Sequence, residues 1–317
     1  MIFDRRGLLI YHTAGAAEDI IIPELSRSFF MDWALTNGFD TVTVNPALNA
    51  GTRYTALSAE LLSHYRCIVV ASEDYAHAGL GSPLPDKLRI HLNNGGREII
   101  VSRDTRLSAS DWGVFLAGTL GILSTHFVKP MRCNNTGCSL SLTFAGAESQ
   151  DPGYPELDVD SLRAFDNEFV RNWLGLGVPI IGNGFLPAVG ALDSLVSGAD
   201  ILYTYIARPE DAIPIHGLPV AFRRVRDGGG FVFFNFPLSV MNVEAGHQAL
   251  DAALVDLEGS ALTNLIPATA ESTAGIMRWL FGTGGSAPDP SWDVNRDGRI
   301  DILDLVETAG RFRVQRQ

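Results

Sequence analysis

Short apolar runs alternate with amphipathic stretches through the first third of the chain. Apolar residues dominate the runs at 7–12, 41–44, 67–71 and 98–101, which predicts buried strands. Between and after these runs, apolar residues recur at helical spacing and predict helices over 23–37, 57–65, 84–92 and 108–122. Strands that are apolar on both faces and alternate with helices are typical of a parallel sheet covered on both sides. We therefore predict a doubly wound, mostly parallel α/β fold.

The pattern becomes richer in strands after residue 125. Segments 125–133 and 139–145 are predicted to form an antiparallel pair, followed by a loop over 147–158 and a helix over 162–174. Further strands are predicted at 179–181, 201–206, 220–226 and 231–236, and the turn Asp227-Gly-Gly-Gly makes the last two a hairpin. Helices over 243–257 and 268–281 close a predicted domain of residues 1–281. Residues 282–291 have the Gly, Pro and Ser content of a linker, which leaves 292–317 as a separate module.

Composition and charge narrow the classes of function. The 317 residues are 46% hydrophobic, and 36 acidic against 24 basic residues give a net charge of −12. Such a balance provides no electrostatic basis for binding nucleic acid or an anionic membrane. No run approaches the roughly 18 apolar residues that a membrane span requires. A short basic cluster, Arg223, Arg224 and Arg226, is expected to be solvated or paired with acids.

The strongest chemical signal lies near the C-terminus. Oxygen-bearing side chains fall at positions one, three, five, nine and twelve of a twelve-residue loop, which also has Gly298 at position six and Ile300 at position eight. This is the spacing of a calcium-binding loop. The predicted Ca²⁺ ligands are Asp293, Asn295, Asp297, the backbone carbonyl of Arg299, Asp301 (directly or through a water) and Asp304. Position twelve is Asp where such loops normally have Glu.

The flanks of the loop define its type. Pro288 and Pro290 are incompatible with an entry helix, whereas apolar residues after the loop predict an exit helix. Asp293 to Leu305 resembles one half of a type I dockerin repeat, with its Asp-Val-Asn-x-Asp-Gly-x-Ile-Asp-x-x-Asp-Leu pattern. The resemblance covers about the last thirty residues and implies calcium, and another protein module, as partners. Dockerins normally carry two such segments, and one is present here.

Cysteines and the first residues bear on the compartment. Cys67 lies in an apolar run and is expected to be a buried thiol, while Cys133 and Cys138 enclose a turn-like Asn-Asn-Thr-Gly. The latter two are predicted to form a disulfide or to remain two thiols, and the calcium loop favours the disulfide by indicating a secreted or cell-surface protein. Met-Ile-Phe-Asp-Arg-Arg is too charged for a secretory leader. We expect a fragment of a longer secreted protein, or a chain whose leader has been removed.

Two short segments suggest a family for the large domain. These are Asn94-Gly-Gly-Arg-Glu-Ile-Ile-Val-Ser102 and Gly228-Gly-Gly-Phe-Val-Phe-Phe-Asn-Phe-Pro-Leu238. Together with the element order, they resemble the class I glutamine amidotransferase-like, flavodoxin-like domain of large secreted bacterial proteins over about residues 7–281. Active members of that superfamily carry a nucleophilic cysteine at the turn after the first segment. The matching residue here is Ser102.

Two functions follow as expectations. The first is a non-catalytic, calcium-binding C-terminal region of a secreted multidomain protein, with a role in assembly, anchoring or stability. The alternative is an extracellular hydrolase with Ser102 as nucleophile, His12 or His77 as base, and Asp104 or Glu73 orienting the base. His12 and His77 are placed at or beyond strand ends, on the edge where ligands bind in open α/β sheets.

Overall fold

The computed structural model describes most of the large domain. The described residues are 5–12, 23–44, 57–73, 84–103, 111–126, 131–134, 137–140, 142–160, 163, 186–187, 189–208, 215–226 and 229–258. Within these ranges, no helix combines the length and the apolar character needed to cross a membrane. The predicted strand 179–181, the helix 268–281, the linker and the calcium loop lie outside the described residues, as does the predicted helix 162–174 apart from Arg163.

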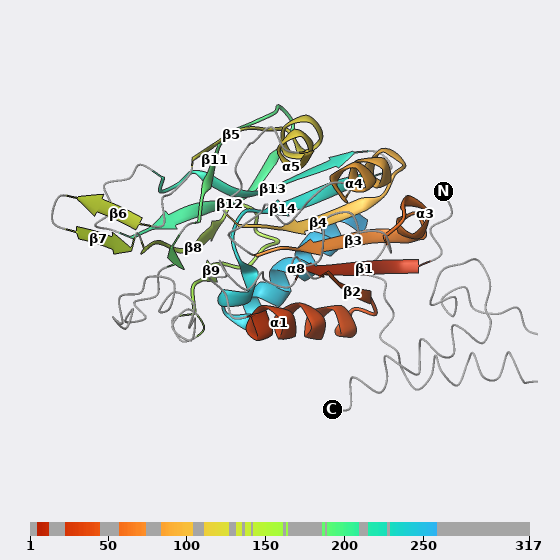
Figure 1. Ribbon diagram of the computed structural model, residues 1–317, viewed down its shortest axis with the longest axis horizontal. Helices are drawn as coiled ribbons and strands as arrows, with labels where there is room; N and C mark the ends of the chain where they lie inside the picture. Colours follow the sequence, from red (N-terminus) through yellow and green to blue (C-terminus); the bar gives the residue numbers. More distant parts are fainter. Residues whose placement is uncertain are drawn as a thin grey trace, which may run out of the picture.

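A mixed sheet forms the centre of the domain (Figure 1), and the described residues contribute ten strands to it. The strand order is β10-β8-β12-β13-β14-β4-β3-β1-β2, with β9 paired to β8. Strands β2, β1, β3, β4 and β14 run parallel, and the others are joined by antiparallel pairing. The predicted α/β class, with a mainly parallel core and antiparallel additions, is therefore confirmed. The strand bounds are β1 Arg5–His12, β2 Asp40–Val44, β3 Tyr65–Ala71, β4 Arg97–Val101, β8 Leu142–Ser149, β9 Leu157–Asp158, β10 Leu186–Pro187, β12 Asp200–Ala207, β13 Pro219–Arg226 and β14 Gly229–Phe234.

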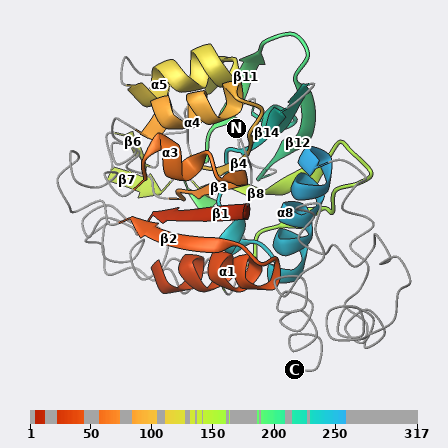
Figure 2. The same cartoon turned by 90° about the vertical axis from the view of Figure 1, so that its right-hand side faces the viewer.

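Helices cover both faces of the sheet (Figures 1 and 2). Helices α1 (Pro23–Thr36) and α8 (Val243–Glu258) lie on one face, and α3 (Ala59–Leu62), α4 (Leu84–Asn93) and α5 (Asp111–Phe115) lie on the other. Each face has its own cluster of buried side chains. Phe29 and Trp33 belong to the first cluster, and Leu88 and Phe115 to the second. Burial of these apolar side chains on both faces of a central sheet is the main stabilising term of such a fold.

Helix 108–122 is shorter and less regular than its sequence pattern predicts. Helix α5 passes into a π-helix, η2 (Leu116–Leu120), and ends at Gly121, which has a φ of 82°. A side chain at Gly121 would also collide with Val196 and approach Arg224. Because only glycine adopts this left-handed conformation without strain, the helix stops here and strand β5 (Ile122–His126) begins.

The predicted antiparallel pair 125–133 and 139–145 is confirmed only where the two segments approach each other, at Met131–Leu140 and Arg132–Ser139, and is wrong for their outer parts. Strand β5 pairs with β11 (Ala191–Leu195), and β8 enters the main sheet beside β12. Between them, β6 (Met131–Asn134) and β7 (Gly137–Leu140) form a separate hairpin. Each predicted strand therefore covers parts of two strands: 125–133 includes the end of β5 and the start of β6, and 139–145 includes the end of β7 and the start of β8. The local pattern of apolar residues does not show which strand pairs with which.

The hairpin register places Cys133 directly opposite Cys138. Opposed residues of an antiparallel pair have Cα atoms about 4.5–5.5 Å apart, within the range that a disulfide spans.

Candidate functional site

The carboxyl ends of the parallel strands bring polar residues to one edge of the sheet. Strand β1 ends at His12, Glu73 follows β3, and Ser102 and Arg103 follow β4. The ladder continues beyond the strands, since the Ser102 backbone N–H donates to the Phe234 carbonyl at 2.8 Å. These polar side chains are nevertheless enclosed: Ser102 and Arg103 are 0% exposed, Glu73 5% and His12 6%. The edge therefore has the expected residues but presents little of them to solvent.

Glu73 is held by hydrogen bonds from two other elements. Ser26 Oγ in α1 donates to Glu73 Oε2 at 2.9 Å, and the Ser239 backbone N–H donates to Oε1 at 3.0 Å. Ser239 Oγ donates to Oε2 as well. Ser239 belongs to a short 3₁₀ helix, η3 (Leu238–Val240), and its carbonyl accepts from Arg163 Nε at 2.7 Å. Glu73 thus connects the end of β3 to α1 and to η3. We call this set of hydrogen bonds, from Ser26 and Ser239 to Glu73, the Glu73 clamp.

Burial and hydrogen bonding act on the Glu73 carboxyl in opposite directions. Burial raises the pKa of Glu73, and the hydrogen bonds from Ser239 and Ser26 partly offset that rise. A carboxylate offers about four acceptor positions, and three are used by these donors. This arrangement suits a structural connection better than a group that orients a histidine.

The structure places the predicted catalytic residues as follows. Ser102, His12 and Glu73 come to the same edge, on the adjacent strands β4, β1 and β3 or just after them. His77 and Asp104 lie outside the described residues. The hydrogen bonds given above for Glu73 lead to two serines. Ser102 is enclosed, so attack on a substrate from solvent would require this edge to open.

Sequence reasoning missed three members of this edge. Arg103, which no sequence motif singles out, is a fully buried arginine. Ser26 and Ser239 are far apart in sequence, and only the fold brings them to Glu73. Burial of arginine has no local sequence signal, because arginine is a common surface residue. The pairing of Glu73 with serines 47 and 166 residues away has none either.

The described part of the chain lacks a cluster of metal-binding side chains. Among the described residues, no group of three or more His, Cys, Asp and Glu side chains could hold a metal ion. All six predicted calcium ligands, at 293–304, lie outside these residues. The calcium loop therefore stays a prediction from sequence.

A second polar pair, His91 and Glu98, is buried at the opposite end of β4. His91 Nδ1 lies 3.2 Å from Glu98 Oε1, and Nε2 lies 2.9 Å from the Tyr65 carbonyl oxygen. Since a carbonyl only accepts, Nε2 must carry a hydrogen. The Nδ1–Oε1 contact then needs one further proton, either on His91 or on Glu98. Burial raises the pKa of Glu98 to about 7, with the hydrogen bond and charge of His91 opposing the rise.

This pair predicts a pH-dependent stability. Because the pKa of Glu98 is higher in the folded than in the unfolded chain, the folded chain binds more protons between about pH 4.5 and 7. The free energy of unfolding should therefore fall as pH rises through that window, by roughly 2 kcal/mol between about pH 5 and 6.5 from this group. Urea unfolding at several pH values measures it. Glu98→Gln should lose this component while keeping its shape, and an unchanged slope in the variant would refute the assignment.

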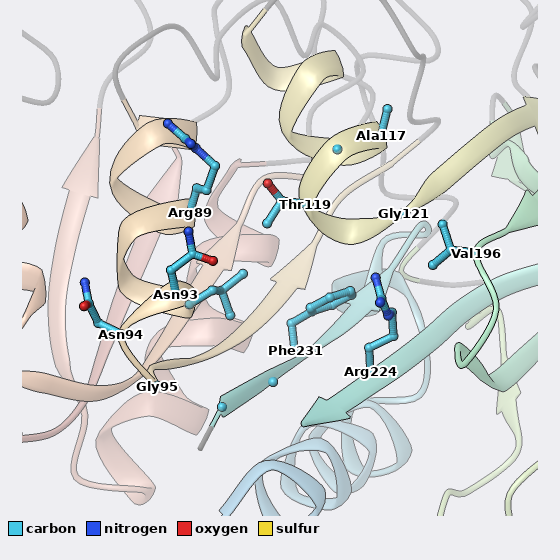
Figure 3. Close-up of a pocket in the computed structure, with 14 residues that line it drawn as sticks. Arg89, Asn93, Asn94, Gly95, Ala117, Thr119, Gly121, Val196, Arg224 and Phe231 are labelled. Carbon is cyan, nitrogen blue, oxygen red and sulfur yellow. The ribbon is translucent and has the colours of Figure 1, made fainter. Parts of the chain in front are cut away.

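A pocket of about 820 Å³ opens beside the amino ends of β4 and β14, at the other edge of the sheet (Figure 3). It is bordered by the end of α4, by η2 and by the β13–β14 hairpin. Arg89, Asn93, Thr119, Arg224 and Phe231 are among its lining residues. This pocket and the predicted catalytic residues thus lie at opposite ends of the parallel strands.

Comparisons with known proteins give a likeness of overall structure. No family model and no curated protein matches the sequence. Among solved structures, the chain is similar to a putative ThuA-like protein from Parabacteroides merdae (11% identity, TM-score 0.44, covering 79% of this chain and 89% of that one). It is also similar to β-galactosidases from Rahnella sp. R3 (11%, 0.41) and Bacillus circulans (10%, 0.39), each covering 80% of this chain. The chain spans about a third of the length of these β-galactosidases, 31% in both cases. The resemblance of the C-terminal loop to a dockerin repeat gains no support from them.

Proposed function

We propose that this chain is a non-catalytic, calcium-binding C-terminal region of a secreted multidomain protein, serving assembly, anchoring or stability. One observation carries the non-catalytic part: the carboxyl edge of the sheet, where open α/β folds bind ligands, is closed by buried side chains. Ser102 is 0% exposed and Glu73 is engaged by Ser26 and Ser239. A fold does not bring its usual chemistry with it unless the site is present.

The alternative, a hydrolase with Ser102 as nucleophile, is supported by one feature. His12, Glu73 and Ser102 share the same edge, and an opening of that edge would expose all three. A serine activated by a base reacts with fluorophosphonates, which form a covalent bond with the nucleophilic oxygen.

Exposure of the intact chain to a fluorophosphonate probe is expected to leave Ser102 unmodified. The physical reason is that the hydroxyl is enclosed in the folded chain. Intact-mass spectrometry and peptide mapping measure the result, with a serine hydrolase treated in parallel to show that the reagent is active. Modification at Ser102 that disappears in Ser102→Ala would establish the hydrolase instead.

Calcium binding is expected to depend on the spaced carboxylates of the loop. Titration calorimetry on the full chain should detect one site with a Kd of about 10⁻⁴–10⁻³ M, the range of extracellular calcium modules. Asp293→Ala should abolish the heat of binding, because the first ligand of the loop is lost. Asp289→Ala, outside the twelve residues, is the matched control and should bind as the parent does. Equal binding by both variants would remove the loop from the proposal.

A further inference from the structure

The hairpin of β6 and β7 stands apart from the main sheet. Within the described part of the chain these two strands pair only with each other, and Figure 1 shows them at one end of the molecule. Each strand is four residues long. A two-stranded hairpin on its own is marginally stable at best in water. The order of this hairpin is therefore expected to need a further stabilising interaction.

The register of the hairpin identifies that interaction. Asn134 pairs with Gly137 and only two residues separate them, so this pair exchanges the hydrogen bonds that close the hairpin. Hydrogen-bonded and non-hydrogen-bonded pairs alternate along an antiparallel ladder. The next pair, Cys133 and Cys138, is therefore of the non-hydrogen-bonded kind, in which opposed Cα atoms are closest, about 4.5 Å apart. Directly opposed residues also share one face of the hairpin.

We propose that Cys133 and Cys138 form a cross-strand disulfide and that the β6–β7 hairpin is ordered only while this bond is intact. The expected separation lies within the range of disulfides, whose Cα atoms are usually about 4.4–6.8 Å apart. The spacing in the sequence is equally compatible with two thiols, whereas the register brings both residues to one position of the ladder. The third cysteine, Cys67, is a free thiol that is 0% exposed in β3, so it does not compete for either partner.

Formation of the bond needs an oxidant, for which a small-molecule disulfide such as oxidised glutathione suffices. The thiolate of one cysteine attacks a glutathione sulfur, which releases one reduced glutathione and leaves a mixed disulfide. The second cysteine then attacks the protein sulfur of that mixed disulfide and releases the second glutathione. Two electrons pass from the cysteine pair to glutathione, and the two thiol protons end on the released glutathiones. Closing this short ring removes conformations from the unfolded hairpin and so favours the ordered form.

Thiol trapping on the full chain tests the bond. The chain is equilibrated with defined ratios of reduced and oxidised glutathione and alkylated, and peptide mapping by mass spectrometry locates each modified cysteine. We expect Cys133 and Cys138 to be linked to each other, while Cys67 stays reduced. The matched control Cys138→Ser/Ser139→Cys keeps three cysteines but moves one thiol opposite Arg132, on the other face of the hairpin. Its equilibrium constant for disulfide formation should be at least about tenfold lower than that of the parent chain.

Hydrogen exchange tests whether the bond orders the hairpin. At short labelling times, the amides of β6 and β7 should exchange at least about tenfold faster in the reduced than in the oxidised parent chain, with β3 and β4 unchanged. Cys133→Ser should exchange like the reduced parent even in oxidising buffer, and circular dichroism checks that the α/β domain stays folded. Two free thiols at Cys133 and Cys138 in oxidising buffer, equal disulfide formation by the parent and the control variant, or hairpin exchange that does not respond to reduction would each overturn the proposal.

Discussion

Replacing Arg223 with alanine is expected to lower the free energy of unfolding by about 3 kcal/mol, because three carboxylates lose their shared cation. Arg223 Nη1 lies 2.9 Å from Asp151 Oδ2 and also pairs with Asp256, while its Nε lies 3.5 Å from Asp200 Oδ2. Tyr154 OH donates to the same Asp256 oxygen at 2.6 Å. The arginine therefore joins β13 to β12, to the segment after β8 and to α8. Urea unfolding followed by circular dichroism measures the loss.

The protonation of Arg223 is consistent with this role. Burial lowers its pKa, but the hydrogen bond and charge of Asp256, with the charge of Asp151, outweigh that effect and raise the pKa above its ordinary value. Arg223→Lys keeps the positive charge but loses the planar guanidinium with its several N–H donors. It should therefore be destabilised less than Arg223→Ala. Arg66→Ala, an exposed arginine of β3, is the matched control. A loss in Arg223→Ala no larger than in Arg66→Ala would show that solvent screens this cluster.

The sequence predicted the fold of the large domain well, and the reason is visible in its strands. Segments such as 67–71 are apolar throughout, and the corresponding strand β3 is buried on both faces of the sheet. The hairpin of β13 and β14 was predicted from its glycine turn, and the structure gives the antiparallel register. The expectation that the basic cluster would be solvated or paired with acids is confirmed at Arg223.

The site was less predictable, because its parts are joined only in three dimensions. The carboxyl edge could be anticipated, since strand ends are local features and parallel strands place them together. That Ser102 would be enclosed, and that Glu73 would bind Ser26 and Ser239, depends on the packing of α1 and η3. The pocket at the amino edge involves residues from α4, η2 and the β13–β14 hairpin, which no sequence spacing connects. The sequence thus shows where strands end and which polar residues lie there. It does not show whether those residues are accessible to solvent.

The two ends of the parallel strands differ in how far their polar side chains are exposed to solvent. At the carboxyl edge, the polar side chains are buried, and Glu73 is hydrogen-bonded within the domain. At the amino edge, exposed or half-buried polar groups border a cavity.

Replacing Glu73 with alanine is expected to lower the free energy of unfolding by about 4 kcal/mol, the largest effect considered for a single substitution. The change removes three hydrogen bonds at once and leaves the Ser26 hydroxyl, the Ser239 hydroxyl and the Ser239 N–H buried without their acceptor. Because η3 and α1 both depend on this carboxyl, the loss should extend to their docking against β3. Urea unfolding gives the total loss, and hydrogen exchange shows whether α1 and the segment around Ser239 lose protection together.

Two variants decide whether Glu73 is structural or catalytic. Glu73→Gln keeps an acceptor oxygen and the shape of the side chain, so it should lose only about 1–2 kcal/mol. Ser102→Ala removes the hydroxyl of the predicted nucleophile and leaves the Glu73 clamp intact, so it should be destabilised less than Glu73→Ala. Residues held for catalysis commonly cost stability, and their replacement by neutral residues often increases it. An increase in stability on Glu73→Gln or Glu73→Ala would therefore contradict the clamp and favour the hydrolase, whereas the graded loss from Gln to Ala identifies Glu73 as a buried connection between β3, α1 and η3.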